Sequence, residues 1–582
     1  METTDKPDVA PGQVPAEGSD TIEITGLSTR LSILIILLVV AALILPIAFM
    51  GIPDGYDLMQ HVRFAASYHD AIVSGEIMPK WAGGDNFGFG SIGIRYYPPL
   101  AYCGLALTRI VTGSWYDSFW ITSFFWMALG SFGVYAWLKE WTTNTLATAA
   151  AIAYAIVPYH TFQIYQAVLY SEFAASGILP FCFLFLTRVC NRRRWIDAVL
   201  FSVAYSSLIL THIPSAIIAT ISLAVYGLVI VDWKKFVDTA LKLGAAFVLT
   251  GLSVAFHLAK AMPEIEWVKH NSPQFFASGY YDYKTYLFPI YFSATWTKYV
   301  EKMLWHYDSI VLLTLLFLLA TLAAYLFTKK ETGIRAIGSK LVPAVMITGG
   351  FALVMLSVTS TTIWHSISFL QKIQFPWRWL SVASLMGAAG FAFALPFLVV
   401  KGRTISRLRG YAVVAFVLII LLDDVSQNLI PSVPLSREIF GQKIEKMYDE
   451  EACDCWWPIW AQREAFDRRT QADAGERKTT IIEWQDASRK IDVAPGTTPE
   501  MRLATFYHPY WKATVNGAET PVGRSNDGSI VVPLPAGAVS VAINFTEPRF
   551  LMPVELLSLF TWIALLVYLA GYLVMRFKRP LQ

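Results

Sequence analysis

Long apolar runs, separated by short polar segments, occupy most of the chain. A run of about 20 apolar residues is long enough for a helix to cross the hydrocarbon core of a bilayer, so the pattern predicts a polytopic all-α membrane protein with about 12 to 13 transmembrane helices. Residues 1–30, which precede the first apolar run, are rich in Pro, Gly and acidic residues, and this composition predicts a disordered cytoplasmic tail. The apolar runs fall at 31–50, 97–112, 119–138, 145–158, 172–190, 195–211, 214–231, 238–258, 308–327, 341–359, 379–400, 410–427 and 553–575.

Lysine and arginine gather in a few segments between these runs, and cytoplasmic loops of membrane proteins carry an excess of both residues. The clusters lie at 192–194, 234–235, 329–340, 401–409 and 576–582. If all of them are cytoplasmic, the loop 51–96 and the segment 429–552 face outward from a cytoplasmic (inner) membrane. If the run at 97–112 also crossed the membrane, the loop 51–96 and the segments after it could not all lie on these sides. The run is short enough to lie in the membrane interface, and the sequence leaves its crossing undecided.

The segment 429–552 differs in pattern from the rest of the chain, because short alternating runs replace the long apolar ones. Turn signals separate these runs, among them Asn516-Gly517, a strong hairpin signal. The pattern predicts an extracytoplasmic β-sandwich between a membrane domain at 31–428 and a final transmembrane helix at 553–575, which a basic cytoplasmic tail at 576–582 follows.

Composition supports the membrane class and removes one type of partner. Of 582 residues, 55% are hydrophobic and 15% are charged, and the formal net charge is only +3. This composition is too apolar for a soluble enzyme, and the charge gives no reason to expect nucleic acid as a partner. The five cysteines show neither zinc-site spacing nor a disulfide framework. Cys453 and Cys455 could be a redox or metal pair, or two free thiols in a loop. We expect the free thiols, since one intervening residue makes a disulfide difficult and no His or Cys cluster completes a metal site.

The loop 51–96 concentrates titratable and glycine residues between two apolar runs, which makes it the first candidate for a chemical site. Asp57 and His61 are four residues apart, so on a helix their side chains can meet. The pair suits a general base, and it equally suits part of a divalent-metal site. A simpler reading is that Asp57 only caps a helix beginning near Leu58. Asp54, Asp85, Arg95 and Tyr97 are further candidates for substrate contact in this loop, and Arg95 lies where we expect a headgroup phosphate.

Three polar residues at the ends of later apolar runs could complete the site. Glu172 begins one apolar run and His212 precedes another, and an acid at membrane depth is a functional candidate. Arg378 lies between two tryptophans at the outer boundary of a further run, where the positive-inside pattern disfavours a cation. We therefore expect Arg378 to contact a phosphate or pyrophosphate.

Several motifs resemble a known family of membrane proteins, labelled 6-pyruvoyl-tetrahydropterin synthase-related, which is similar in plan to the GT-C superfamily of integral-membrane glycosyltransferases. The segment FYHPYWKATVNG at 506–517 also resembles the outer β-domain of YfhO-type glycosylation proteins. The motifs that carry the family resemblance are YDLMQH at 56–61, PKW at 79–81, NFGFG at 86–90, YYPPL at 96–100, YSEFA at 170–174, THIP at 211–214 and QFPWR at 374–378.

The resemblance implies an enzyme that moves a sugar from a polyprenyl-phosphate donor to a glycan, lipid or protein acceptor on the outer face of the membrane. It implies that Asp57 activates the acceptor, that His61 orients Asp57 or contacts substrate, and that Arg378 holds the donor phosphate. The presence of both Asp54 and Asp57 leaves the identity of the base open. A divalent metal, magnesium or manganese, also stays open, with Asp57 and His61 as its candidate ligands.

Two other functions are compatible with a membrane protein of this kind. A transporter or flippase for a lipid-linked glycan would commonly carry an internal repeat and polar residues at the membrane midplane, whereas here the titratable residues gather at one boundary. A scaffold that binds envelope glycan through its β-domain would leave the charged first loop unexplained. The sequence therefore favours a transferase, then a transporter, then a scaffold.

Overall fold

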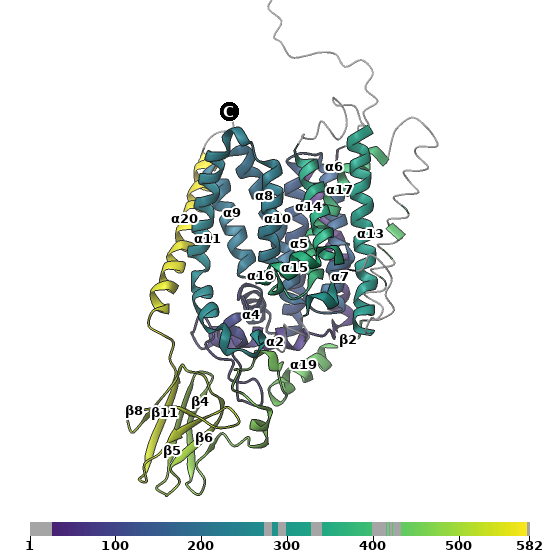
Figure 1. Ribbon diagram of the computed structural model, residues 1–582. Coiled ribbons are helices and arrows are strands. Elements are labelled where there is room, and N and C mark those ends of the chain that lie inside the picture. The colour runs from purple at the N-terminus through teal and green to yellow at the C-terminus, as the bar shows by residue number, and fades with distance from the viewer. Residues whose placement is uncertain are drawn as a thin grey trace, which may run out of the picture.

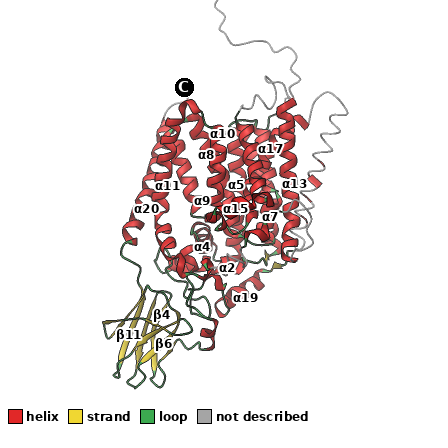
Figure 2. Ribbon diagram, in the orientation of Figure 1, coloured by secondary structure: helices red, strands yellow, loops and turns green. Residues whose placement is uncertain are grey.

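The computed structural model describes residues 26–272, 282–288, 298–327, 340–398 and 432–578, together with a few single positions between 415 and 426. Four predicted segments lie wholly or mostly outside these ranges: the N-terminal tail, the basic cluster at 329–340, the basic cluster at 401–409 and the helix at 410–427. The described residues form a bundle of long helices with a small β-domain below one end of it (Figure 1). Almost all of the helices lie in the bundle and most of the strands lie in the β-domain, as Figure 2 shows. The predicted fold class is confirmed.

Seven helices of the described residues are long and apolar enough to cross a membrane. Serine or threonine caps begin some of them: Ser28 accepts a hydrogen bond from the backbone of Leu31, and Ser114 from that of Asp117. The α-helices that form most or all of each span are α1 (Thr29–Met50), α5 (Trp115–Lys139), α8 (Tyr170–Arg192), α10 (Ile213–Ile230), α11 (Phe236–Glu264), α17 (Leu380–Leu398) and α20 (Leu551–Lys578).

Other helices complete the bundle and its lower rim. Four of these contain shorter apolar segments: α4 (Leu100–Thr112), α9 (Trp195–Ile209), α13 (Lys298–Phe327) and α14 (Leu341–Leu356). The remaining ones are α2 (Leu58–Val73), α3 (Gly93–Tyr96), α6 (Asn144–Ala155), α7 (Pro158–Tyr165), α15 (Thr361–Ser366), α16 (Ser368–Gln371) and α19 (Arg437–Lys446).

Helix α4 does not cross the bundle, which resolves the conflict in the helix count. Strand β1 (Ile52–Pro53) directly follows α1 and pairs with β2 (Pro434–Leu435), which is followed by α19. Arg437 at the start of α19 binds Asp117 in the first turn of α5, at 2.6 Å. The end of α1 and the beginning of α5 therefore lie on the same side, so the chain between them enters the bundle and returns through the 13 residues of α4 without crossing it.

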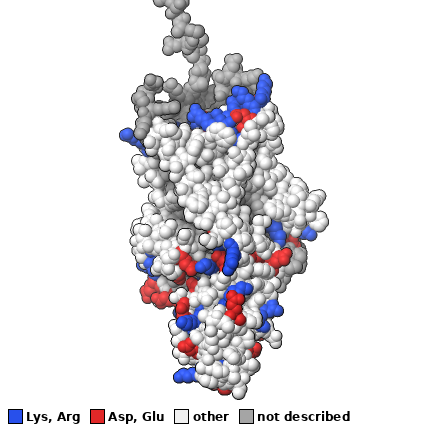
Figure 3. Space-filling view, turned by 90° about the vertical axis from the view of Figure 1, so that its left-hand side faces the viewer, with Lys and Arg blue, Asp and Glu red and all other residues white. Residues whose placement is uncertain are grey.

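Basic residues collect at the end of the bundle opposite the β-domain. Arg188 binds Glu140 at 2.7 Å there, and the Lys340 ammonium donates to the carbonyl of Val231 at 2.6 Å. In the face drawn in Figure 3, lysine and arginine gather at this end, an uncharged band follows, and charges of both signs return at the junction with the β-domain. The uncharged band has the character of a surface that faces lipid.

The β-domain consists of two antiparallel sheets. Asn516 and Gly517 form the predicted two-residue hairpin, with φ of 49° and 82°, so that Val515 pairs with Ala518. The first sheet has the order β3 (Ala472–Asp473), β6 (Glu500–Phe506), β10 (Ser529–Pro533), β9 (Gly523–Arg524). The second has the order β4 (Thr479–Gln485), β5 (Ser488–Val493), β11 (Val539–Phe545), β7 (Trp511–Val515), β8 (Ala518–Thr520).

The first loop, 51–96, joins the bundle to the β-domain. The backbone N–H of Phe506 in β6 donates to the carbonyl of Phe89, and the side-chain oxygen of Asn86 accepts from the backbone of Ala452 at 2.8 Å. Gly84 allows this docking, because a Cβ atom there would lie 2.8 Å from the ring of Tyr448. The loop is therefore fixed from both sides, and helix α2 within it is held at the lower end of the bundle.

Candidate functional site

Asp57 stands immediately before α2 and has a free carboxylate. It occupies the N-cap position, but its side chain makes no capping bond, and no hydrogen bond or ion pair to this carboxylate occurs among the described residues. Asp57 is exposed, yet enough protein surrounds it that desolvation raises the pKa of its carboxyl to about 6, with Arg378 opposing the rise and Glu172 adding to it. The simple capping interpretation is thus wrong, and Asp57 is poised to exchange a proton near neutral pH.

Arg378 and Glu172 form a buried ion pair close to Asp57. The Nε atom of Arg378, in the turn Pro376–Trp379 before α17, donates to Oε2 of Glu172, in the first turn of α8, at 2.8 Å. Tyr159 donates to the other carboxylate oxygen at 2.5 Å. The Nη1 atom of Arg378 donates to the carbonyl of Ile373 and to the side chain of Gln374, at 2.6 and 2.8 Å. No partner of Nη2 occurs in the described part of the chain, which leaves one edge of the guanidinium available to a ligand.

His61 lies beside this group, but both of its ring nitrogens are engaged elsewhere. The Nε2 atom accepts from the backbone N–H of Tyr170 at 3.2 Å, so Nδ1 carries the proton and donates to the Tyr102 hydroxyl at 2.7 Å. Burial lowers the pKa of His61 to about 3, which keeps the ring neutral. The expected contact between the Asp57 and His61 side chains is absent from the described contacts. Because Asp57 precedes the helix, with φ −105° and ψ 3°, the helical spacing rule does not apply to it.

Two further predicted residues lie in the same place. His212 at the start of α10 is buried and shares a hydrogen bond between Nδ1 and the Ser215 hydroxyl, at 2.8 Å. Its pKa is lowered, first by burial and then by Arg378 and His61, which shows that these cationic and histidine groups are neighbours. The Tyr97 ring lies edge-on to His61 with centroids 6.1 Å apart. Asp57, His61, Tyr97, Glu172, His212 and Arg378 therefore converge from distant parts of the sequence.

Three predicted site residues are placed elsewhere by the structure. Asp54 forms an exposed ion pair with Lys443 of α19 at 2.7 Å. Asp85 is buried and accepts from the Ser91 hydroxyl at 2.8 Å, with Arg63 at 3.5 Å, so it fixes the first loop.

Arg95 is the third, and its cation is already neutralised. It donates through two nitrogens to both carboxylate oxygens of Glu264, each at 2.7 Å, and through a third to Glu547 at 2.7 Å. Because Glu264 ends α11 and Glu547 connects β11 to α20, Arg95 fastens the loop, the bundle and the β-domain together. It has no free edge for the phosphate that the sequence suggested.

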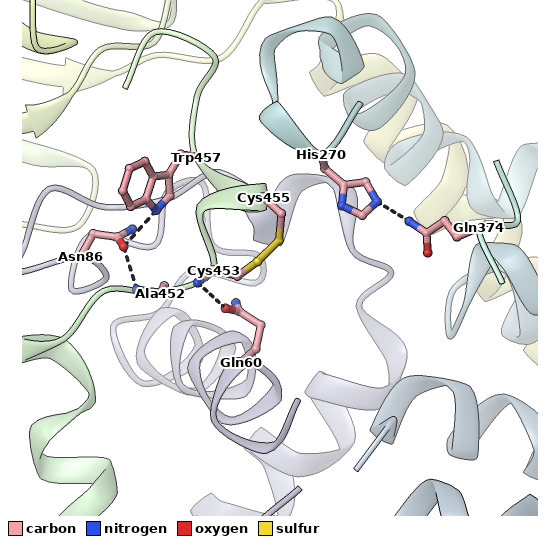
Figure 4. Close-up of a disulfide and its surroundings, with 8 residues drawn as sticks. All are labelled: Gln60, Asn86, His270, Gln374, Ala452, Cys453, Cys455 and Trp457. Carbon is pink, nitrogen blue, oxygen red and sulfur yellow. Dashed lines mark hydrogen bonds between the residues drawn. A yellow bond between two sulfur atoms is a disulfide. The ribbon is translucent and has the colours of Figure 1, made fainter. Parts of the chain in front are cut away.

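Groups that the sequence did not indicate as site residues cover the site from the side of the β-domain. His270 and Gln374 share a hydrogen bond, and Figure 4 shows them beside a disulfide between Cys453 and Cys455. The expectation of free thiols at Cys453 and Cys455 is therefore wrong: a tight turn places their Cα atoms 5.3 Å apart, within the range that a disulfide spans. Gln374 has a φ of 71°, and such a conformation in a non-glycine residue often marks a functional position.

The described residues do not supply a metal site at this place. No group of three His, Cys, Asp or Glu side chains with suitable geometry occurs among them. The lone pair of His61 Nε2 is used by a backbone N–H, and Glu172 is bound to Arg378. The suggested pair of Asp57 and His61 therefore does not fit a divalent cation.

A comparison with protein families identifies the chain. Residues 94–430 match the family described as "6-pyruvoyl-tetrahydropterin synthase related domain; membrane protein". The chain belongs to this family. The match confirms the resemblance seen in the sequence, and it includes Glu172, His212 and Arg378. No curated protein matches the chain in sequence.

Solved structures of membrane glycosyltransferases overlap with the chain at low similarity. The arabinofuranosyltransferase AftD from Mycobacteria has 15% identity and a TM-score of 0.46, over 90% of this chain and 40% of that one. The oligosaccharyltransferase of Archaeoglobus fulgidus has 14% identity and a TM-score of 0.44, over 75% and 57%. For ArnT from Cupriavidus metallidurans bound to undecaprenyl phosphate the values are 12% and 0.31, over 89% and 99%. The chain thus spans less than two thirds of the length of the arabinofuranosyltransferase and of the oligosaccharyltransferase.

Proposed function

We propose that this protein transfers a sugar from a polyprenyl-phosphate donor to the hydroxyl of a glycan, lipid or protein acceptor at the outer face of the membrane. The observation that carries the proposal is the free carboxylate of Asp57 beside a buried arginine whose Nη2 edge is open. A desolvated base and a fixed cation, close together at the end of a membrane bundle, are the two groups that such a transfer needs. The proposal rests on this arrangement and on the family motifs, and it draws nothing from the distant structural overlaps.

Asp57 acts as the base. As the acceptor oxygen forms its bond to the anomeric carbon, the Asp57 carboxylate takes the hydroxyl proton. Its pKa of about 6 keeps it ionised at neutral pH and raises its basicity above that of an ordinary aspartate. Asp54 does not fill this role, because Lys443 holds it in an exposed ion pair.

Arg378 receives the leaving group. The bond between the anomeric carbon and the phosphate oxygen breaks, and the bonding electrons move to that oxygen. The guanidinium stabilises the polyprenyl phosphate so formed through its open edge. Glu172 and Gln374 hold the guanidinium in place at 2.8 Å each, so little reorganisation is needed during the reaction.

Two independent features support an outward orientation of the site and the β-domain in a cytoplasmic membrane. Arg188, Arg192 and Lys340 lie at the opposite end of the bundle, as the positive-inside pattern requires for the cytoplasmic side. The Cys453–Cys455 disulfide lies on the side of the β-domain, and disulfides persist in oxidising compartments. Both features support transfer on the face away from the cytoplasm.

A transfer assay in nanodiscs tests the proposal. The full-length protein is given radiolabelled polyprenyl-phosphate sugars and envelope lipids as acceptors, and release of polyprenyl phosphate is measured. We expect wild type and Asp54→Asn to be active, while Asp57→Asn stays folded and loses activity by a factor of about 10² to 10⁴. Full activity of Asp57→Asn would refute the assignment of the base. If no donor is turned over and labelled glycolipid is scrambled across reconstituted vesicles, the protein is a transporter.

A further inference from the structure

The disulfide beside the site is the only one among the described residues, which include all five cysteines. The chain has five cysteines, and Cys103, Cys182 and Cys190 are free thiols. Cys453 is exposed, whereas Cys455 is only 4% exposed. The exposed sulfur-bearing residue faces solvent while its partner is packed inward, so a thiol reagent can approach from one side without entering the protein core.

The turn that the disulfide closes places one large aromatic side chain. Trp456 follows Cys455 directly and stacks on His270, with ring centroids 4.5 Å apart and an angle of 7° between the planes. It also meets Tyr97 edge-on, with centroids 5.3 Å apart, and its carbonyl accepts from the backbone of Ile92 at 3.3 Å. The disulfide therefore fixes a residue that packs on two side chains of the site region.

A short chain of contacts leads from this tryptophan to the arginine of the site. His270 accepts a hydrogen bond from the side-chain nitrogen of Gln374, whose oxygen accepts from Arg378 at 2.8 Å. On the other side of the turn, the backbone N–H of Cys453 donates to Gln60 at 3.4 Å. Figure 4 shows the disulfide between Gln60 and the pair of His270 and Gln374. Since Gln60 is three residues after Asp57, the turn contacts both elements that supply the proposed site.

We propose that the Cys453–Cys455 disulfide is a thiol-exchange site that positions Arg378 for binding a lipid phosphate, through Trp456, His270 and Gln374. A dithiol reductant attacks one sulfur as a thiolate and forms a mixed disulfide. Its second thiol then displaces that sulfur, so that the protein gains two thiols and the reductant becomes a disulfide. The released turn no longer presses Trp456 on His270, and the guanidinium loses a fixed hydrogen-bond partner. The assignment of the lipid phosphate to Arg378 rests on the proposed function.

The experiment uses the full chain in nanodiscs and two measurements that require no turnover. The first is the affinity for undecaprenyl phosphate, and the second is amide hydrogen exchange at 268–271 and 373–378, each before and after dithiothreitol. Loss of one hydrogen bond to a charged group predicts that reduction weakens the affinity about tenfold. We expect Cys453→Ser/Cys455→Ser to show the reduced values at all times, with no response to dithiothreitol. Cys103→Ser, which keeps the disulfide, serves as the matched control and should respond like wild type.

The outcomes separate this proposal from the proposed function. A weaker affinity together with faster exchange after reduction, both reversed by reoxidation, supports the positioning role. If mass spectrometry shows the pair fully reduced while exchange at 268–271 and 373–378 is unchanged, the positioning role is refuted. If exchange rises on reduction but the oxidised protein binds no undecaprenyl phosphate, the disulfide still positions Arg378 and the phosphate-binding function is refuted.

Discussion

The ionisation of Asp57 gives the sharpest test of the chemistry. With a pKa of about 6, the carboxylate is about 90% ionised at pH 7 and about 10% ionised at pH 5. The basic form is the active one, so kcat/KM for transfer should fall about tenfold between these values and level off above pH 7. This fall at acid pH, the acid limb of the profile, reports the pKa of the base in the free enzyme, which is the state that the structure describes. An ordinary aspartate would leave the rate constant over this range, because its pKa is near 3.9.

A substitution of Glu172 tests whether Asp57 is the group that titrates. Glu172 is one of the charges that raise the pKa of Asp57, and it also neutralises Arg378, which lowers that pKa. Glu172→Gln removes the raising charge and leaves Arg378 unpaired, so the acid limb should move to lower pH. The measurement is a pH profile of kcat/KM between pH 4.5 and 8 for both proteins, with Asp54→Asn as a control that keeps the wild-type limb. An acid limb that stays at the same pH in Glu172→Gln would refute the reasoning.

Three further substitutions test separate parts of the arrangement. Arg378→Lys keeps the charge but loses the planar guanidinium. We expect kcat/KM for the lipid donor to fall about 10- to 100-fold, while the thermal unfolding temperature changes little. An unchanged kcat/KM would contradict the phosphate role of Arg378. Arg95→Met leaves the buried Glu264 without its cation and should cost about 3 to 5 kcal/mol of stability, seen as earlier thermal unfolding in detergent; a neutral effect would mean that the pair does not fasten the domains. His61→Gln removes hydrogen bonds to Tyr102 and Tyr170 and should lower stability without moving the acid limb, whereas a shifted limb would give His61 a part in proton transfer.

The sequence predicted those features that depend on local pattern. Apolar runs identified the helices, and Asn516-Gly517 identified a hairpin, because both are decided within a few residues. Glu172 and Arg378 stood out for a similar reason, since a charge at the end of an apolar run is costly unless it has a partner. The sequence could not show that they are partners of each other, 206 residues apart.

Features that depend on contacts between residues far apart in the sequence could not be predicted. Arg95 seemed free to bind phosphate, but its partners Glu264 and Glu547 are 169 and 452 residues away. His270 carries no local signal, because its position beside the site depends on the turn at Cys455. The sequence correctly indicated a helix that begins near Leu58, but the predicted contact between the Asp57 and His61 side chains is wrong, since the helix begins one residue after Asp57.

The depth of the site follows from helices that are too short to cross. Helix α4 has 13 residues and α9 has 15, which correspond to about 20 and 22 Å, against about 30 Å for a bilayer core. Their ends meet inside the bundle, where the backbone of Leu100 donates to the carbonyl of Leu210 at 2.8 Å. Irregular backbone at that depth is stable only where protein surrounds it. His212 follows this turn directly, so the two short helices place its side chain inside the bundle, where it is buried close to Arg378.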